Sequence, residues 1–458
     1  MRLNKKSKGG GIGKSFLFIM LALIIGAGVY VALVFFESSE PQLALQDKLS
    51  YVGKKAEFTL TAADDNSGLR SVRFVLVQNG KEHTLLEKDF PRRGYTGQIG
   101  PLSVTETIPF NTEEADVENG EAELVVRASD YSLRGFFSGN TGEIRRKVTI
   151  DTVAPKLRLL HTERYINRGG SGIVIYQIDG ETSRHGADFA GYFHDGFPLE
   201  EGKNIFIAYI AVPYNTEVIS TSQIVAEDAA GNQSLLPFSP VFKKVEFKRD
   251  TINVGDGFLS EKIPEFENFY PEMQGSMKDK YLYTNRTVRK ENNEKIYQLC
   301  QDPSPERLWS GSFIRMAGAN RAGYADHRSY FYKSEEIDKQ VHLGMDIASV
   351  QRAEVKAANT GKVVFADYLG IYGNMVLLDH GQGVFSLSSH LSSIQVETGD
   401  LVESGVIIGT TGKTGMAGGD HLHFSMLING IFVTPMEWWD SHWIEVTIEA
   451  PLDEVRFE

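Results

Sequence analysis

The sequence has 458 residues, of which 41% are hydrophobic and 23% are charged, and its formal net charge at pH 7 is -13. A chain of this length is expected to hold more than one domain. The acidic balance argues against nucleic-acid binding, because phosphate contacts need a basic face. The single cysteine, Cys300, excludes an internal disulfide framework and is expected to be a packed small hydrophobe.

The N-terminus begins with a basic segment and continues into an apolar run. Residues 1–15 carry five basic residues and no acidic one, and the next 21 residues, 16–36, carry no charge. At about 1.5 Å of rise per residue, a helix of this length crosses the hydrocarbon core. We therefore predict a cytoplasmic segment over 1–15 and a transmembrane anchor over 16–36, with the remainder exported. A cleaved signal peptide is the alternative, although its apolar region is usually about 7 to 15 residues long.

Short alternating runs separated by Gly, Asn and Asp turns fill residues 42–250. Strands are expected at 58–62, 72–77 and 124–128. A weak repeat pairs a strand ending in an acidic turn with a closing strand, once near Asp130 and again near Asp228. This pattern predicts two β-sandwiches, 42–151 and 152–250. The junction Asp151-Thr-Val-Ala-Pro155 resembles the start of bacterial immunoglobulin-like domains, and Asp228-Ala-Ala-Gly-Asn232 resembles their penultimate turn.

Little in these sandwiches points to chemistry. The loop Asp64-Asp-Asn-Ser-Gly68 has some features of a calcium loop, but it lacks the downstream Glu and the full ligand spacing, so a plain turn is the simpler interpretation. The four scattered histidines of this region receive no role. We expect the region to act as a spacer or to bind a partner at a sheet edge.

Residues 251–309 mix acidic and basic side chains and are predicted to form exposed helices or loops. Their position ahead of the last domain motivates a second hypothesis, that they are a linker or a lid over a groove. The final domain is expected over 310–445. There, 312–316 alternates like a strand, and residues 330–332 form an aromatic run that is expected to be buried.

Histidines concentrate in the last quarter of the chain: seven of the eleven lie at or beyond residue 327. Three short pieces stand out, namely His342-Leu-Gly-Met-Asp346, the isolated His390, and His421-Leu-His423. In extended segments, alternate side chains share a face, so each spaced pair can meet. Two imidazoles and one carboxylate with an open position are typical of a catalytic zinc site. The spacing does not decide which histidine of the last pair would bind the metal.

The setting of these pieces is more specific than the pieces alone. The stretch from about residue 341 to 438 resembles the lysostaphin-like, or LytM-type, zinc endopeptidases, which cut peptides of bacterial cell walls. The resemblance is carried in uninterrupted order by HLGMDIAS, GKVVFADYLGIYGNMVLLDHGQG, SHLSSIQVETGDLVESGVIIGTTGKTG and GGDHLHFSMLINGIFVTP. The alternation of these pieces and their glycine turns predict an antiparallel β-sheet domain.

The resemblance implies roles for five residues. His342, Asp346 and His423 become the zinc ligands, and His390 and His421 the catalytic imidazoles. The chain departs from the family at two nearby positions: Ser388 stands where an aromatic residue is usual, and Ser425 stands where an acidic residue is frequent. These departures concern substrate positioning more than metal binding.

The sequence thus predicts a mainly β protein with an N-terminal transmembrane helix, two immunoglobulin-like sandwiches and a C-terminal metallopeptidase domain. We expect a zinc endopeptidase of the inner membrane that cuts peptidoglycan peptides in the periplasm or outside the cell. The absence of a His-Glu-x-x-His motif separates it from the thermolysin type. One alternative is a non-catalytic module that activates a cell-wall amidase through a regulatory protein contact. The other is an adhesive protein in which the sandwiches are the functional part.

Overall fold

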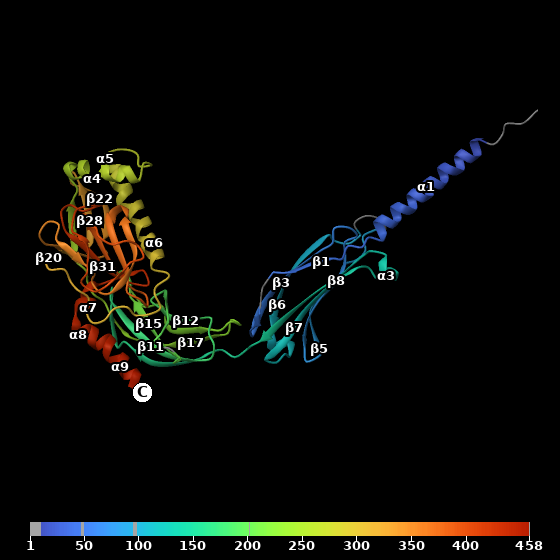
Figure 1. The fold of residues 1–458 in the computed structure, drawn as a ribbon, viewed down its shortest axis with the longest axis horizontal. Helices are drawn as coiled ribbons and strands as arrows, with labels where there is room; N and C mark the ends of the chain where they lie inside the picture. The colour runs from blue at the N-terminus through green and yellow to red at the C-terminus, as the bar shows by residue number, and fades with distance from the viewer. Residues whose placement is uncertain (1–10, 47–49, 95–98, 201, 458) are drawn as a thin grey trace, which may run out of the picture. The chain divides into compact units, whose positions relative to one another are not determined.

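A computed structural model describes residues 11–46, 50–94, 99–200 and 202–457. The predicted basic segment lies largely outside these residues. The chain divides into two compact units, which are described separately. The first comprises residues up to Val153 together with Ala229–Asn232, and the second comprises Ala154–Asp228 and the residues from Gln233 onward. The structure is mainly β with an N-terminal apolar helix, as the sequence predicted (Figure 1).

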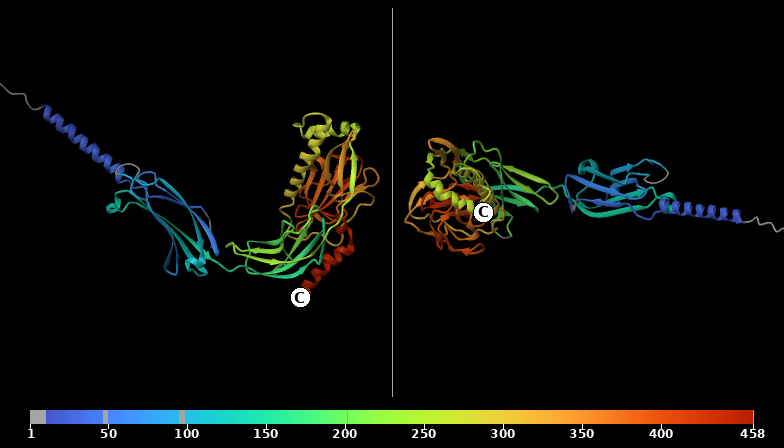
Figure 2. Two further views of the ribbon diagram at one scale, coloured as in Figure 1. Left: turned by 180° about the vertical axis from the view of Figure 1, so that it is seen from behind. Right: turned by 90° about the horizontal axis from the view of Figure 1, so that it is seen from above.

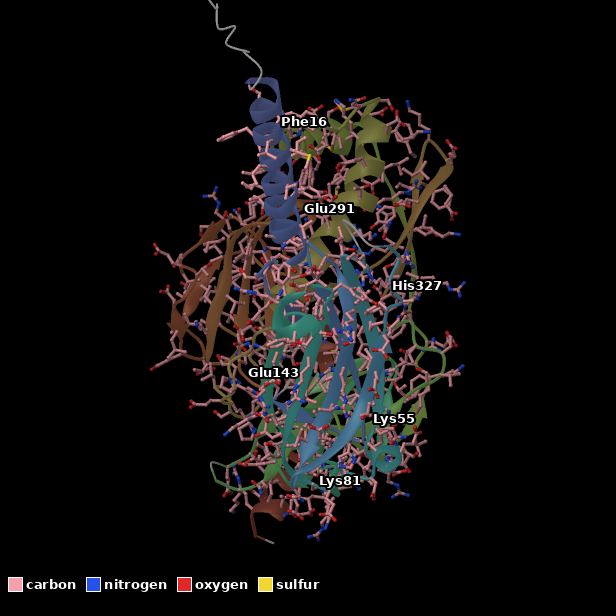
Figure 3. The ribbon with its side chains drawn as sticks, turned by 90° about the vertical axis from the view of Figure 1, so that its right-hand side faces the viewer. Phe16, Lys55, Lys81, Glu143, Glu291 and His327 are labelled. Atoms are coloured by element: carbon pink, nitrogen blue, oxygen red, sulfur yellow. The ribbon has the colours of Figure 1, made fainter. Side chains whose placement is uncertain are left out.

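The first unit begins with the long helix α1 (Gly11–Phe35). Its apolar side chains, such as Phe16, are exposed and project away from the helix axis (Figure 3). The window Ser15–Ala32 is long and apolar enough to cross a membrane, by length and composition. A membrane anchor and a signal sequence both have this character, so the helix is compatible with both interpretations of the sequence.

Two sheets packed face to face follow α1. One has the strand order β1 (Gln42–Leu45), β3 (Lys55–Ala63) and β6 (Ser103–Asn111). The other has the order β2 (Tyr51–Val52), β8 (Thr141–Ile150), β7 (Gly120–Asp130), β4 (Leu69–Gln78) and β5 (Lys81–Asp89). The short helix α2 (Thr112–Ala115) connects the two sheets, and α3 (Arg134–Phe137) lies between β7 and β8 of the second sheet. Alternate residues of β3 and β4 are buried between the sheets, where the rings of Phe58 and Phe74 meet edge to face. The three strands predicted here are confirmed.

The second unit opens with another two-sheet sandwich. Its first sheet has the order β14 (Phe197–Pro198), β15 (Ile205–Ala211), β11 (Ser171–Asp179) and β9 (Lys156–Thr162). The other has the order β13 (Tyr192–Asp195), β12 (Arg184–Phe189), β16 (Ser222–Glu227) and β17 (Gln233–Pro237). Strands β10 (Tyr165–Asn167) and β18 (Val241–Lys243) pair beside them.

The central sheet of the second unit carries the segments singled out in the sequence. Its order is β20 (Ala319–Ala322), β23 (Met345–Ala348), β31 (Leu422–Ile428), β27 (Val384–Leu391), β26 (Asn374–Asp379), β25 (Gly361–Tyr368) and β29 (Leu401–Val402), and β32 (Ile431–Val433) pairs with β31. A small sheet joins β24 (Glu354–Lys356), β30 (Ile407–Thr410) and β28 (Ser393–Ile394). Leu422, Phe424 and Met426 of β31 face a hydrophobic core, which is the face that the alternation predicted.

Helices lie at two places around this sheet. Ahead of it in the chain come α4 (Asp256–Phe269), α5 (Met277–Tyr283), the π-helical turn η1 (Thr284–Val288) and α6 (Arg289–Leu299). After it come α7 (Pro435–Trp439), α8 (Ser441–Ile444), η3 (Glu445–Glu449) and α9 (Ala450–Phe457). A third sheet, β19 (Arg249–Asn253), β21 (His327–Tyr332) and β22 (Glu335–Val341), leads into the site. Figures 1 and 2 show α4 and α5 at one end of this unit and α7 to α9 on another side.

One sequence expectation for this region was wrong. Residues 312–316 alternate like a strand but form no strand. Their backbone bonds elsewhere: Phe313 N–H donates to the carbonyl of Trp438, and Ile314 N–H donates to the carbonyl of Ala358. Anchoring to two different segments prevents a regular ladder with either.

The second sandwich and the central sheet share one hydrophobic core. Tyr209 of β15 packs near Trp309 and Trp438, with ring centroids 6.3 Å apart in both pairs. Beside them, Glu437 of α7 accepts hydrogen bonds from the backbone N–H of Ser171 at 2.8 Å and from its hydroxyl at 3.2 Å. Burial raises the pKa of Glu437 to about 7. This junction therefore holds the sandwich and the sheet together through both apolar packing and a buried polar contact.

Candidate metal centre

Strand register brings the three sequence pieces together. Strands β23 and β31 are antiparallel, and Asp346 lies directly opposite His423. On the other edge of β31, Ser389 of β27 lies opposite His423, which places His390 beside it. His421 precedes β31 and forms an isolated bridge with Gly412. Segments separated by about 80 residues therefore meet in the middle of one sheet.

Three donor atoms converge at this point. His342 Nε2 lies 2.9 Å from Asp346 Oδ1 and 2.9 Å from His423 Nδ1, and His423 Nδ1 lies 3.0 Å from Asp346 Oδ1. All three side chains are buried, and their donor atoms lie within 4.8 Å of one another. Two nitrogens and one carboxylate oxygen make a donor set suited to zinc, with room for a further ligand.

The partner of each donor residue fixes which of its atoms faces the centre. His342 Nδ1 lies 2.8 Å from the carbonyl of Gly323, so Nδ1 carries the proton and Nε2 carries the lone pair. The Ser425 hydroxyl donates to the carbonyl of Leu343 at 2.8 Å and can accept from His423 Nε2–H at 3.1 Å, which leaves the lone pair on His423 Nδ1. Outer contacts of this kind orient metal ligands and set their tautomers.

The carboxylate of Asp346 is held in the same way. Arg328 of β21 donates to Asp346 Oδ2 at 3.0 Å, so Oδ1 is the oxygen that faces the imidazoles. Burial alone would raise the pKa of Asp346, but the charge attraction to His342 and the hydrogen bonds that His342, His421 and His423 can donate when they carry a proton on the facing nitrogen hold that pKa well below its usual range. The group is therefore ionised in the state in which it can bind a cation.

Gly344 allows the first piece to approach β31. A side-chain carbon at this position would lie 2.6 Å from His423 Nε2, from the carbonyl oxygen of Phe424 and from Ser425 Oγ. The chain bends here between β22 and β23 rather than running on as one extended segment. His342 and Asp346 still meet, as the sequence predicted, but they do so across this bend.

Two further imidazoles lie beside the donor set. His390 Nδ1 is 2.9 Å from the carbonyl of Thr414, and His421 Nδ1 is 2.7 Å from the carbonyl of Gly419. Both Nδ1 atoms therefore donate, and each Nε2 carries a lone pair. The two rings lie 4.9 Å apart, and His421 Nε2 is 3.5 Å from Asp346 Oδ1. These two imidazoles are groups that can transfer protons next to the three donor atoms.

Their electrostatic surroundings differ. Burial lowers the pKa of His390, and the neighbouring His421 and His423 lower it further. Burial also opposes protonation of His421, but its hydrogen bond and attraction to Asp346 prevail and raise the pKa of that ring. Two neighbouring imidazoles with pKa values displaced in opposite directions are suited to acid and base roles.

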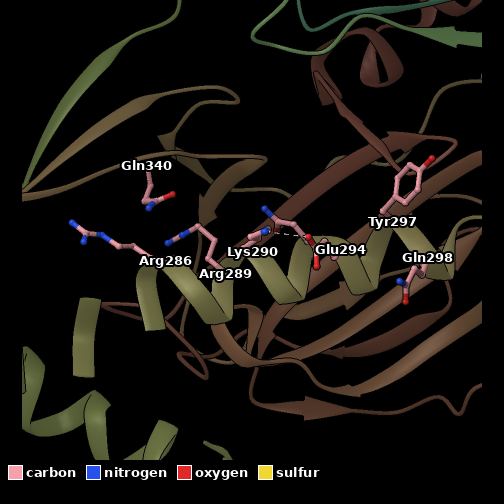
Figure 4. A pocket seen from close by; sticks show the side chains of 8 residues that line it. Arg286, Arg289, Lys290, Glu294, Tyr297, Gln298 and Gln340 are labelled. Atoms are coloured by element: carbon pink, nitrogen blue, oxygen red, sulfur yellow. Dashed lines mark ion pairs between the residues drawn. The ribbon is translucent and has the colours of Figure 1, made fainter. Parts of the chain in front are cut away.

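The site opens into a cavity of about 410 Å³. It is lined by the histidines, by Tyr281, Tyr330 and Tyr372, and by residues between 250 and 258. Arg321, Arg328 and Arg289 of α6 add positive charge to the lining. A second hollow of about 500 Å³ lies along η1 and α6 and is lined by Arg286, Lys290 and Gln340 among others (Figure 4). It contains none of the converging histidines.

Helix α4 forms direct contacts with the loop that precedes His421. Glu265 accepts a hydrogen bond from the backbone N–H of Gly415 at 2.7 Å, and Glu261 pairs with Lys413 at 2.6 Å. The buried Lys262 ammonium donates to the carbonyl of Lys413. The segment that the sequence assigned to a linker or lid is thus ordered against one wall of the cavity.

Other histidines stay apart from the site. His380 is buried, with Nδ1 2.7 Å from the carbonyl of Thr360 and Nε2 2.8 Å from Ser386 Oγ, and burial lowers its pKa to about 4. It lies under the sheet as a structural residue. His327 and His442 are exposed.

Sequence reasoning missed the residues that hold the donor set and the two neighbouring imidazoles in place. Arg328, Gly323 and Thr414 lie outside the motif pieces or act through backbone carbonyls, which carry no side-chain signal. Ser425 was noted as a departure from the family, and it is the residue that contacts His423. One signal was available: Arg328 lies two residues before the buried Tyr330 on β21, so the two side chains point to the same face of the strand.

Comparison with known proteins identifies the family of this region. Residues 340–435 match the Peptidase family M23. The chain is 39% identical over 97 residues to the DD-carboxypeptidase/endopeptidase Mpg of Neisseria meningitidis, which covers 21% of this chain and 22% of that protein. It is 37% identical over 95 residues to the murein hydrolase activator EnvC of Escherichia coli, and this alignment covers 21% of this chain and 23% of EnvC. Residues 340–435 therefore form a domain of peptidase family M23, and the predicted lysostaphin-type resemblance is confirmed.

Solved structures add one comparison. The catalytic domain of lysostaphin from Staphylococcus simulans is 31% identical, and the alignment covers 27% of this chain and 92% of that chain with a TM-score of 0.24. The match to the curated relatives spans only about a fifth of their length. These relatives include both a peptidase and an activator of hydrolases. The family match therefore identifies the domain but does not distinguish between these two roles.

Proposed function

We propose that this protein is a membrane-anchored zinc endopeptidase that hydrolyses peptide bonds of peptidoglycan during cell-wall remodelling. In this proposal, His342, Asp346 and His423 hold the zinc ion, and His390 and His421 are the catalytic imidazoles. The observation that carries it is that three donor atoms lie within 4.8 Å of one another. In each of these residues, the other ring nitrogen or carboxylate oxygen forms a hydrogen bond elsewhere. Helix α1 would anchor the protein in the inner membrane, with the peptidase domain in the periplasm or outside the cell.

Zinc, when bound, would supply a Lewis acid for the scissile carbonyl and lower the pKa of bound water. The residues of the chain supply the rest. His390 and His421 present Nε2 lone pairs because their Nδ1 atoms donate to the carbonyls of Thr414 and Gly419. One imidazole would take the proton of the attacking water at its Nε2 lone pair and deliver it to the leaving amine, while the other, carrying a proton on Nε2, would donate a hydrogen bond to the developing oxyanion.

The cavity walls give the proposal a substrate preference. Peptidoglycan peptides carry free carboxylates, and Arg321 and Arg289 line the cavity beside the centre. Guanidinium groups recognise carboxylates through paired hydrogen bonds. Tyr281 and Tyr330 add apolar surface against which a peptide backbone can lie.

The test uses the full-length protein in detergent micelles. Zinc content and peptide release from purified peptidoglycan are measured for the unaltered chain, for His423→Ala, and for His442→Ala as the matched control, because His442 is an exposed histidine away from the centre. We expect about one zinc per chain and released peptides, both lost in His423→Ala and both kept in His442→Ala. Full cleavage by His423→Ala would contradict the proposal.

The second candidate is an activator of a cell-wall amidase. Two observations favour it: the similarity to EnvC, and the position of α4 against the loop before His421. The same preparation, assayed with an added amidase, separates the two. Stimulation of the amidase that persists in His423→Ala, with no peptide release by the unaltered chain, would identify the activator.

A further inference from the structure

A second group of acidic side chains meets at one end of the first sandwich. Glu37 follows α1, Asp64 follows β3, and Asp130 ends β7. One oxygen of each lies within 4.8 Å of the others. Asp64 and Asp130 are 3% and 0% exposed, and Glu37 is partly buried. Three carboxylates from three distant segments therefore share one enclosed space.

This concentration of negative charge is not balanced by a cation of the protein. Within the part of the chain that the structure describes, none of the three carboxylates pairs with a lysine or an arginine. Burial raises the pKa of Glu37, and the adjacent Asp130 raises it further. Burial likewise raises the pKa of Asp64. The three groups are thus close together at an electrostatic cost that a bound cation would remove.

One carboxylate oxygen of the group lacks a hydrogen-bond partner among the described residues. Asp64 Oδ1 accepts hydrogen bonds from the backbone N–H groups of Asn66 at 3.2 Å and Gly68 at 2.6 Å, which closes the turn. Asp64 Oδ2 is buried and has no hydrogen-bond partner among the described residues. An unpaired buried carboxylate oxygen is costly, and within this group it indicates a missing ligand.

Further polar groups surround the same space. The Ser67 hydroxyl lies 3.2 Å from Glu37 Oε1. The side-chain amide of Asn140 lies 2.8 Å from Asp130 Oδ2 and 3.1 Å from the carbonyl oxygen of Glu37. Turning this amide by half a rotation would present its oxygen instead of its nitrogen. The donors here are oxygens, and such sets with several carboxylates suit calcium, which takes 6 to 8 oxygen ligands.

We propose that Glu37, Asp64 and Asp130 bind a calcium ion, and that this ion fixes the segment after α1 to the first sandwich. The carbonyl oxygen of Glu37 already accepts hydrogen bonds from Ser132 and Asn140 of the sandwich. Figures 1 and 2 show α1 leading directly into the end of the sandwich that carries α3. The ion would stiffen the exit from the apolar helix. This site is independent of the peptidase centre and of its proposed activity.

The test measures calcium binding to the full-length protein in detergent. The chain is stripped of metals and reloaded with zinc, and calcium binding is then followed by equilibrium dialysis. We expect one saturable calcium per chain, weakened at least about tenfold by Glu37→Gln and by Asp64→Asn. The matched control is Asp65→Asn, because Asp65 is the exposed neighbour in the same loop and should leave binding unchanged.

Hydrogen exchange provides the second readout. Calcium should slow amide exchange in residues 36–41 of the unaltered chain and of Asp65→Asn, but not in Glu37→Gln. Because Glu37 is only partly buried, Glu37→Gln decides the case if Asp64→Asn does not fold. The absence of saturable binding in the unaltered chain would overturn the proposal, as would equal binding by Glu37→Gln. Tighter binding of magnesium than of calcium would overturn the assignment of the ion.

Discussion

This protein has a histidine-rich cluster in its second unit and a carboxylate cluster in its first, and the two differ in the groups that surround their donor atoms. The cluster around Asp346 combines imidazoles with one carboxylate and has beside it two further imidazoles, His390 and His421, whose Nδ1 atoms donate to backbone carbonyls and whose Nε2 atoms can exchange a proton. The cluster of Glu37, Asp64 and Asp130 is all carboxylate, and its neighbours are hydroxyl, amide and backbone groups. The first set suits zinc and proton transfer. The second suits calcium and contains no imidazole, and an all-carboxylate set of this kind suits a structural site.

The largest effect expected from this difference is on catalysis at the histidine cluster. His421→Ala should lower the rate of peptide release by about 100- to 10,000-fold, because it removes an acid-base group. Zinc content should remain near that of the unaltered chain, since in the proposal His421 is not a ligand. The measurement is metal analysis beside a single-turnover cleavage assay. Loss of zinc together with activity would instead make His421 a ligand.

The sequence predicted the five residues of this centre because three short segments held them in a recognisable order. From their alternation it also predicted some strands of the central sheet, such as the one carrying His423. The carboxylate cluster escaped it for a physical reason. Its three carboxylates come from separate segments: Glu37 lies 27 residues before Asp64, and Asp130 lies 66 residues after it. A search for ligand spacing finds calcium ligands only when they lie within one loop.

The second effect concerns the arginine that holds Asp346. Arg328→Gln removes the charge that binds Asp346 Oδ2, so the carboxylate loses its orientation. Outer contacts of this kind typically change metal affinity or activity by about 10- to 100-fold. We expect zinc to dissociate faster, as measured by transfer to a chromogenic chelator. Arg321→Gln is the matched control, because Arg321 lines the same cavity and forms no ion pair within the described residues. Equal zinc release by both variants would show that Arg328 does not position the carboxylate.

A smaller effect is expected at Ser425. Its hydroxyl links His423 Nε2–H to the carbonyl of Leu343, and Ser425→Ala removes that link without adding bulk. The zinc affinity should fall by roughly tenfold, the lower end of the range for outer contacts. Ser425→Thr, which keeps a hydroxyl, should recover part of the loss in the same chelator assay. An alanine variant with unchanged affinity would mean that packing alone fixes the tautomer of His423.

The smallest effect distinguishes the carboxylate cluster by its response to pH. Because the pKa values of Glu37 and Asp64 are raised, protons compete with calcium at a higher pH than at ordinary carboxylates, and affinity should fall by about two- to fourfold when the pH reaches those raised values. In the metal-free protein, lower pH should have the opposite effect and stabilise the fold. Between the raised and the ordinary pKa values, the folded state binds more protons than the unfolded state, so the free energy of unfolding should increase as the pH falls towards the ordinary pKa values.

Thermal unfolding of the first unit, followed with and without calcium across pH, should therefore give curves that converge in acid and separate towards neutral pH. Glu37→Gln should reduce the separation, whereas parallel curves would show that calcium does not bind at these carboxylates.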